Sequence, residues 1–181
     1  MKTLPCGSAL LTIVAVGILA GCAPISQSPD VSGDIRGLLD QAGLKQVSVK
    51  QDRDKGVVTL GGNVELDSDK ARAEAIAKSN ATGQVVSDQI AVLPKGEEDH
   101  ARAMNSGVDK GIRQNMDAAL LVNNLGDGVK YSVKNDVVTL RGEVDSQAKR
   151  QQAETVAVAV PNVKQVVDEL QVKNQKATSP Q

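Results

Sequence analysis

Apolar and polar positions alternate along most of the chain with the two periods that are typical of helices and strands. The helical spacing occurs twice, first in Ile35, Leu38, Leu39 and Ala42 and then in Ile112, Met116, Ala119 and Leu120. Each of these faces is followed by a stretch of period two, residues 47–49 and 129–133, which predicts a half-buried strand. The pattern therefore predicts two similar units of mixed α and β structure.

Comparison of the two units shows an internal repeat. Residues 57–64, Val-Val-Thr-Leu-Gly-Gly-Asn-Val, recur as residues 137–144, Val-Val-Thr-Leu-Arg-Gly-Glu-Val, 80 positions later. The same offset continues without a gap to Asp88 and Asp168 and to the valines at 92 and 172. An ungapped repeat of this length indicates duplication of one structural unit.

The rest of each unit follows from local signals. Asn135-Asp136 suits a two-residue hairpin turn, whereas the first unit has a longer loop over residues 52–56. Asp67 and Ser146 are expected N-caps of a second, alanine-rich helix. The closing strands are predicted over residues 86–92 and 166–172. Each unit thus has the order α-β-β-α-β.

The N-terminus resembles a bacterial lipoprotein signal. Lys2 and an apolar run over residues 9–20 predict an export signal, and this run is shorter than the roughly 20 residues that span a bilayer. The sequence Leu-Ala-Gly-Cys that ends at Cys22 resembles a lipobox, which implies cleavage before Cys22 and a diacylglyceryl group on its thiol. The alternative is an ordinary cleaved signal followed by an unrelated cysteine.

The cysteine count agrees with acylation. Cys6 is lost with the signal, so Cys22 is left as the single thiol of the mature chain. Ala23 follows it, which by similarity to enteric lipoproteins implies sorting to the outer membrane. Residues 23–33 read as a polar tether whose eleven residues span roughly 35 Å when fully extended.

Composition excludes several functions. The 181 residues include no Trp, no Phe, one Tyr and one His, so a multi-histidine metal site cannot form and base-stacking platforms for nucleic acid are not expected. The net charge of −1 also differs from that of a general nucleic-acid binder. The core must consist of Val, Leu, Ile and Ala.

Candidate chemistry is sparse. His100 lies beside Glu98 and Asp99, where a metal site is the alternative to a solvated histidine in a linker. Asp88 and Asp168 occupy the same place in both units, either as functional acids or, as we expect, in an edge-strand or capping role. We therefore predict no catalytic residues, no metal site and no cofactor.

Charge distinguishes the two halves. Residues 23–99 carry 9 basic and 13 acidic side chains, a net of −4, whereas residues 100–181 carry 11 and 9, a net of +2. A hairpin turn at Asn135-Asp136 would place Lys130 opposite Arg141, with Lys134 on the same face. Two like charges that face each other across a strand pair are destabilising, and an anionic partner would stabilise them. The candidate anionic-surface residues are Lys110, Arg113, Lys130, Lys134 and Arg141; the alternative is a solvated face.

The two repeated units resemble the BON domain, and two such units behind a lipobox resemble the dual-BON lipoproteins of Gram-negative envelopes. The resemblance rests on the Val-Val-Thr-Leu strand, the alanine-rich helix and the closing strand. It implies an α+β fold of two tandem αββαβ sandwiches, each a three-stranded mixed sheet packed by two helices. The expected organisation is signal peptide 1–21, lipidated Cys22 and tether 22–33, first domain 34–94, acidic linker 95–105, second domain 106–173 and polar tail 174–181.

The expected function is a non-enzymatic protein that is anchored in the outer membrane, faces the periplasm and touches anionic phospholipid through its second domain. The resemblance further implies a contribution to envelope integrity or stress tolerance. The alternative is an adaptor that binds an envelope protein or peptidoglycan and contacts the membrane only through Cys22. Binding of nucleic acid is not expected.

Overall fold

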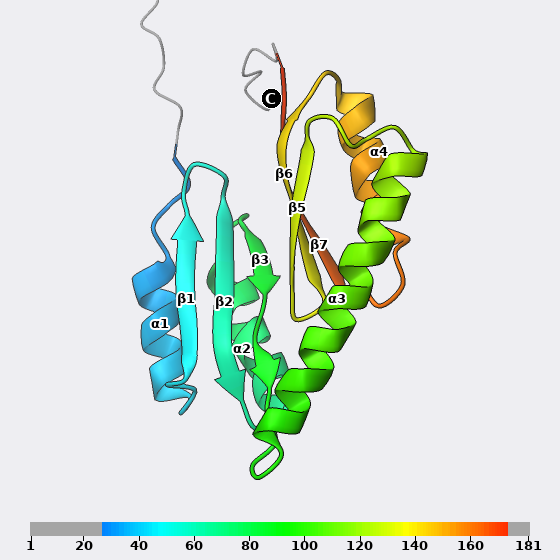
Figure 1. Ribbon diagram of the computed structural model, residues 1–181. Coiled ribbons are helices and arrows are strands. Elements are labelled where there is room, and N and C mark those ends of the chain that lie inside the picture. Colours follow the sequence, from blue (N-terminus) through cyan, green and yellow to red (C-terminus); the bar gives the residue numbers. More distant parts are fainter. Residues whose placement is uncertain (1–26, 174–181) are drawn as a thin grey trace, which may run out of the picture.

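A computed structural model describes residues 27–173 and confirms the duplicated order of elements (Figure 1). The first domain contains α1 (Ser32–Gln41), β1 (Val47–Asp52), β2 (Val57–Val64), α2 (Asp67–Asn80), β3 (Val85–Asp88) and β4 (Ala91–Val92). The second contains α3 (Glu98–Val122), β5 (Val129–Lys134), β6 (Val137–Val144), α4 (Gln147–Val158) and β7 (Gln165–Val172).

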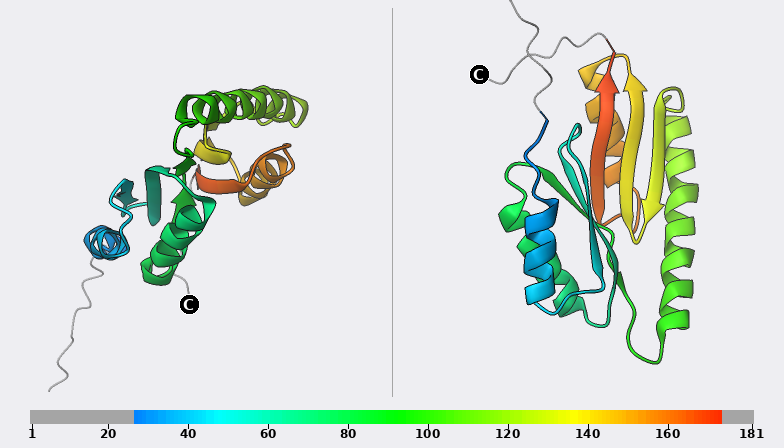
Figure 2. Two further views of the ribbon diagram at one scale, coloured as in Figure 1. Left: turned by 90° about the horizontal axis from the view of Figure 1, so that it is seen from below. Right: turned by 90° about the vertical axis from the view of Figure 1, so that its left-hand side faces the viewer.

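Each domain is a mixed sheet with two helices on one face (Figure 2). β1 is antiparallel to β2 and β3 is parallel to it, and β5, β6 and β7 repeat this arrangement. The predicted helix faces form the cores: Ile35 and Leu39 are fully buried in the first domain, and Ile112 and Met116 in the second. The fold is therefore the α+β tandem sandwich expected from the repeat.

The hairpin of the second domain has the predicted register. Asn135 and Asp136 have φ values of 48° and 66°, as a two-residue turn with a left-handed backbone requires, and Lys130 lies opposite Arg141. Gly142 has a φ of 117°, and a Cβ there would lie 2.1 Å from the carbonyl oxygen of Gly128. Glycine at this position therefore marks the close backbone approach that its place in a strand suggested.

Helix starts were predicted with mixed success. Ser146 caps α4, since its hydroxyl accepts a hydrogen bond from the Lys149 amide at 3.2 Å. Asp67 is not a cap: α2 begins one residue earlier than expected, with Leu66 at the N-cap position and its carbonyl accepting from Asp69 and Lys70.

Three predicted boundaries differ in the structure. The segment 95–105 is largely helical and not an irregular linker, because α3 begins at Glu98 and continues for 25 residues, which places His100 on an ordered helix. The tether is shorter than predicted, because residues 27–31 pack on the first domain and Val31 is 8% exposed. The closing strand of the first domain is divided into β3 and β4.

Candidate functional site

The three strand cations of the predicted basic surface lie on the face of the second sheet that its two helices do not cover, part of which packs on the first domain at Val137 and Val167. Tyr131 and Val133 alternate with them and pack against the helices, so Lys130, Lys134 and Arg141 point the other way. All three are exposed. The alternation of β5 thus produces the basic face that the pattern predicted.

Arg141 already has an anionic partner within the molecule. Its Nε atom lies 2.9 Å from a carboxylate oxygen of Glu169 on the neighbouring strand β7, and Lys55 of the first domain reaches the same oxygen at 2.7 Å. The Glu169 side chain is only 5% exposed. Burial alone would raise the pKa of Glu169, but the bonds from Arg141 and Lys55 outweigh burial and hold the pKa below its usual value. The like-charge repulsion at Lys130 and Arg141 is therefore relieved internally.

Lys110 and Arg113 belong to another layer. They lie on α3, which covers the opposite face of the sheet, and the Tyr131 hydroxyl donates a hydrogen bond to the Arg113 carbonyl at 2.9 Å. The five predicted cations consequently do not form one flat patch. Within residues 27–173, no ion pair includes Lys110, Arg113, Lys130 or Lys134.

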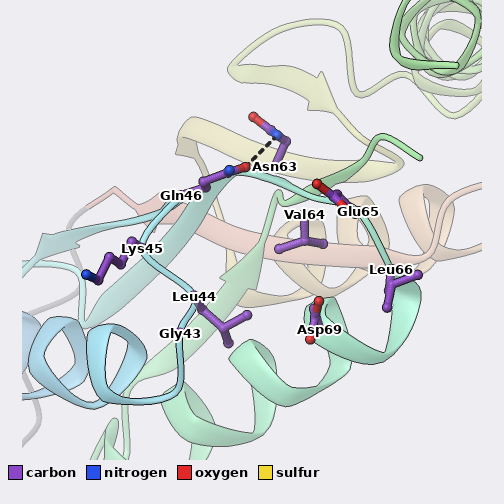
Figure 3. A pocket seen from close by; sticks show the side chains of 9 residues that line it. All are labelled: Gly43, Leu44, Lys45, Gln46, Asn63, Val64, Glu65, Leu66 and Asp69. Carbon is purple, nitrogen blue, oxygen red and sulfur yellow. Dashed lines mark hydrogen bonds between the residues drawn. The ribbon is translucent and has the colours of Figure 1, made fainter. Parts of the chain in front are cut away.

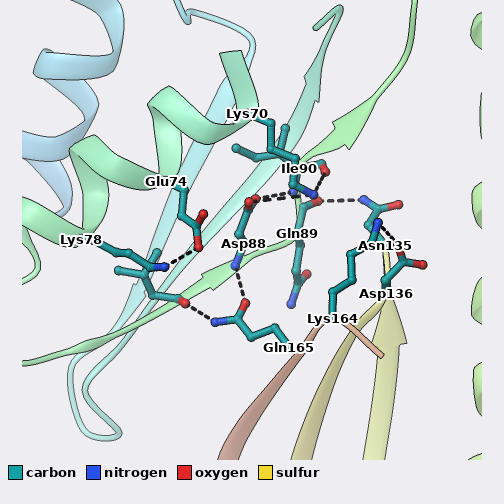
Figure 4. A network of polar contacts seen from close by, with 11 residues as sticks. Lys70, Glu74, Lys78, Asp88, Gln89, Ile90, Asn135, Asp136, Lys164 and Gln165 are labelled. Atoms are coloured by element: carbon teal, nitrogen blue, oxygen red, sulfur yellow. Dashed lines mark hydrogen bonds and ion pairs between the residues drawn. The ribbon is translucent and has the colours of Figure 1, made fainter. Parts of the chain in front are cut away.

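A polar seam joins the two domains (Figure 4). The side-chain amide of Gln165, at the start of β7, donates to the backbone carbonyl of Val86 at 2.6 Å and accepts from the backbone amide of Asp88 at 3.0 Å. The side chain thereby pairs with the outer edge of β3 as a neighbouring strand would. Asn135 extends the seam by donating to the carbonyl of Gln89 at 2.8 Å.

α3 supports the hairpin turn at this seam. The two carboxylate oxygens of Asp109 accept hydrogen bonds from the backbone amides of Asn135 and Asp136, each at 3.0 Å. Asp109 is buried, at 9% exposure. No residue of the seam was singled out for this role from the sequence, because its partners are 26 to 79 positions apart.

Asp88 and Asp168 have the structural role that we expected. Each accepts a hydrogen bond from the amide two residues later and faces a basic residue at the same offset, Lys70 at 3.8 Å and Arg150 at 2.7 Å. Burial raises the pKa of Asp88 above its usual range, against the opposing effects of the Ile90 amide and Lys70. The pair ties the second helix of each domain to the closing strand.

Hollows on the surface formed by residues 27–173 include three that lie beside the elements described above. One of about 400 Å³ lies at the end of the first domain, where Gln46 and Asn63 bond to each other beside Glu65, Leu66 and Asp69 (Figure 3). One of about 330 Å³ opens on the seam beside Lys70, Lys78 and Lys164, and one of about 280 Å³ lies between α3 and α4. Among the described residues, no three metal-ligating side chains of the His, Cys, Asp and Glu types converge.

None of the helices within residues 27–173 is long and apolar enough to cross a membrane. Cys22, the predicted lipid attachment, lies outside the described residues, as do the signal and the tail 174–181.

The geometry defines a tandem pair of αββαβ sandwiches that are joined by a polar seam. Residues 29–94 and 108–174 both match the BON domain. The chain belongs to the BON-domain family, as its repeat suggested.

A curated relative supports this membership. The chain is 32% identical over 144 residues to the osmotically-inducible protein Y of Escherichia coli strain K12, an alignment that covers 75% of this chain and 67% of the relative. Among solved structures, the C-terminal domain of CdsD, a structural protein of the type III secretion system of Chlamydia trachomatis, aligns at 14% identity and a TM-score of 0.30. That alignment covers 78% of this chain and 65% of CdsD, and its TM-score is too low to indicate a shared overall arrangement.

Proposed function

We propose that this BON-domain protein is a non-enzymatic component of a Gram-negative cell envelope, anchored in the outer membrane through diacylglyceryl-Cys22. The lipobox-like sequence before Cys22, the tandem BON domains and the similarity to the osmotically-inducible protein Y support this proposal. A role in envelope integrity or stress tolerance would follow from a stable contact with the envelope surface.

The second domain would make that contact with anionic phospholipid. The observation that carries this step is Lys130 and Lys134 on β5, which no described acidic side chain pairs. Lys110 and Arg113 on α3 are not paired by a described acidic side chain either, but they lie on the opposite side of the sheet. Each basic residue near an anionic bilayer contributes about 1 kcal/mol. Because the chain has no Trp or Phe for the interface, the contact would be electrostatic and would weaken as salt rises.

Vesicle flotation tests this contact. Mature protein without the acyl group should bind phosphatidylglycerol vesicles at low salt and should not bind phosphatidylcholine vesicles. Replacing Lys130→Gln or Lys134→Gln should weaken binding about fivefold each. Lys50→Gln is the matched control, because Lys50 is an exposed lysine on the corresponding strand of the first domain. Equal binding to both vesicle types would contradict the proposal.

Arg141→Gln separates lipid contact from structure. Since Glu169 holds Arg141, this change should lower stability while leaving vesicle affinity within about twofold of the unaltered protein. A loss of affinity as large as that of Lys130→Gln would mean that Arg141 leaves Glu169 for lipid.

A second candidate function is that of an adaptor for an envelope protein. Met104 and Val108 lie one helical turn apart on α3 and are 58% and 36% exposed. A cross-linker at position 104 that yields one defined protein product in cells, with no change when the four lysine and arginine side chains are neutralised, would favour this candidate.

A further inference from the structure

Large hydrophobic side chains are exposed toward both ends of α3. Of the seven large hydrophobic side chains that are exposed among residues 27–173, four lie on this helix. Met104 and Val108 lie in its first half and are 58% and 36% exposed, and Leu121 and Val122 lie at its end and are 76% and 78% exposed. α3 runs along the outside of the molecule, so its outward side is free to meet another molecule (Figures 1 and 2).

Small residues separate the two apolar ends. At 3.6 residues per turn, Gly107, Gly111 and Ala118 lie on one side of the helix, opposite the buried Ile112 and Met116. A Cβ at Gly107 or Gly111 would have nothing within 4 Å. The distance between packed helices is set by the side chains at the contact, so a second helix can approach this stretch closely. The outer face of α3 thus consists of Met104, Gly107, Gly111, Ala118, Leu121 and Val122.

Opposite charges lie along one margin of the outer face. Lys110 and Asp117 are two helical turns apart and both exposed, and no described ion pair includes Lys110. In an antiparallel pair that places Met104 opposite the partner's Leu121, Lys110 comes within two positions of the partner's Asp117, about 3 Å along the axis. Twofold symmetry forms this ion pair twice. The margin is therefore complementary in charge to a second copy of itself.

An anionic bilayer fits the outer face less well. The helix begins with Glu98 and Asp99, and Asp117 lies one turn before Leu121. These carboxylates would face anionic head groups, and the chain has no Trp or Phe for the membrane interface.

We propose that two copies of this chain pair through the outer faces of α3 in antiparallel orientation. Met104 packs against the partner's Leu121 and Val122, Gly107 lies against the partner's Ala118, and Lys110 pairs with the partner's Asp117. The occupant is a second copy because one face supplies the large ends, the small middle and both charges that the contact needs. Lys130 and Lys134 lie on the opposite side of the sheet and stay outside this interface. The inference does not rest on the proposed lipid contact.

The size of the outer face predicts a weak dimer. From Met104 to Val122 the helix is about 30 Å long, and a helix is about 10 Å wide. The contact is therefore smaller than the roughly 800 Å² per partner of a standard interface. We expect a dissociation constant weaker than about 1 µM.

Sedimentation velocity of the mature Cys22→Ser protein tests the dimer. The protein should change from monomer to dimer as its concentration rises toward about 1 mM. Met104→Glu or Leu121→Glu should weaken the dimer about tenfold or more, because a charge would be buried against apolar side chains. Val158→Glu is the matched control, because Val158 is 62% exposed on α4, and it should leave the dimer unchanged. A protein that is monomeric at all these concentrations, or equal effects of all three variants, would overturn the inference.

Gly107→Leu separates the interface from the stability of the fold. This variant should fold at least as stably as the unaltered protein, because leucine favours a helix and nothing lies within 4 Å of the Cβ position. It should nevertheless weaken the dimer about tenfold, because the added side chain keeps the two helices apart. A dimer of unchanged affinity in a stably folded Gly107→Leu protein would show that the outer face is not the interface.

Cysteine cross-linking tests the antiparallel arrangement. Cys6 is removed with the signal, so in the Cys22→Ser protein an introduced cysteine is the only thiol. A tagged Met104→Cys chain mixed with an untagged Leu121→Cys chain should form the mixed disulfide on mild oxidation. Two copies of Met104→Cys should not, because their positions 104 lie 17 residues apart along the pair, about 25 Å, and a disulfide needs Cα atoms within about 7 Å. Equal cross-linking in both mixtures would contradict the arrangement.

Vesicle flotation distinguishes a second copy from a bilayer. If Met104→Glu weakens the dimer and leaves binding to phosphatidylglycerol vesicles unchanged, the outer face binds a second copy, as proposed. If Met104→Glu abolishes vesicle binding and the unaltered protein is monomeric, the outer face binds the bilayer and the inference is wrong.

Discussion

Tyr131 joins β5 to α3 through its hydroxyl. The hydroxyl donates to the Asp117 carboxylate at 2.5 Å as well as to the Arg113 carbonyl. Burial and the hydrogen bond to Asp117 raise the pKa of Tyr131 to about 12. Since Tyr131 is the single tyrosine of a chain without Trp, its ionisation can be followed directly by absorbance.

We predict that Tyr131 titrates near pH 12 in the folded protein and that Asp117→Asn lowers its pKa toward 10. The sign for stability follows from linkage. The unfolded chain loses this proton first, so the free energy of unfolding should fall as pH rises from 10 toward 12. Absorbance titration near 295 nm, with urea denaturation at pH 8 and pH 11, checks both statements. An unchanged tyrosine pKa in Asp117→Asn would contradict the assignment.

At the scale of elements, Gly142 on β6 and Gly111 on α3 differ in how much space surrounds them. Gly142 on β6 has a left-handed backbone and contacts the Gly128 carbonyl, so any Cβ there would clash. Gly111 on α3 has nothing within 4 Å of its Cβ position. The first position requires glycine, whereas the second tolerates other residues.

We predict opposite effects of alanine at these two positions. Gly142→Ala should lower the free energy of unfolding by about 2 kcal/mol or more, because it combines a positive φ with a backbone overlap. Gly111→Ala should raise it by up to about 1 kcal/mol, since alanine favours the helix. Chemical denaturation of both variants provides the comparison, and a stabilising Gly142→Ala would show that the close approach relaxes without cost.

At the scale of the whole molecule, the seam makes the first domain depend on the second. Val57 packs with Val137 and Val167 across the seam, and Gln165 occupies the edge of β3. A free strand edge is otherwise open to pairing with other chains. The first domain should therefore be less stable in isolation than the second.

We predict that Gln165→Ala increases amide hydrogen exchange at Asp88, whose amide bonds to the Gln165 side chain. The change should propagate along β3 and leave the core of the second domain, at Leu140, protected. Gln171→Ala is the control, because Gln171 is exposed on the same strand. Exchange measured by NMR would contradict the seam if Asp88 remained equally protected in both variants.

The sequence alone determined the local structure of this protein. The 80-residue repeat, the helix faces around Ile35 and Ile112 and the hairpin register at Lys130 and Arg141 follow from side-chain period and turn chemistry, which act between residues close in the chain. The resemblance to the BON family could be seen in the sequence for the same reason, because it rests on these local patterns. Local signals are weaker at the ends of helices and strands. The sequence therefore did not show that the acidic segment before residue 105 forms the start of α3.

The tertiary structure alone decided which charges remain free. Glu169 neutralises Arg141 together with Lys55, a residue 114 positions away, and α3 lies on the face opposite Lys130. The packing of residues 27–31 on the β1–β2 turn likewise sets how far Cys22 can reach. Such pairings depend on contacts between distant segments, and a periodicity carries no information about which distant side chain will occupy a given face.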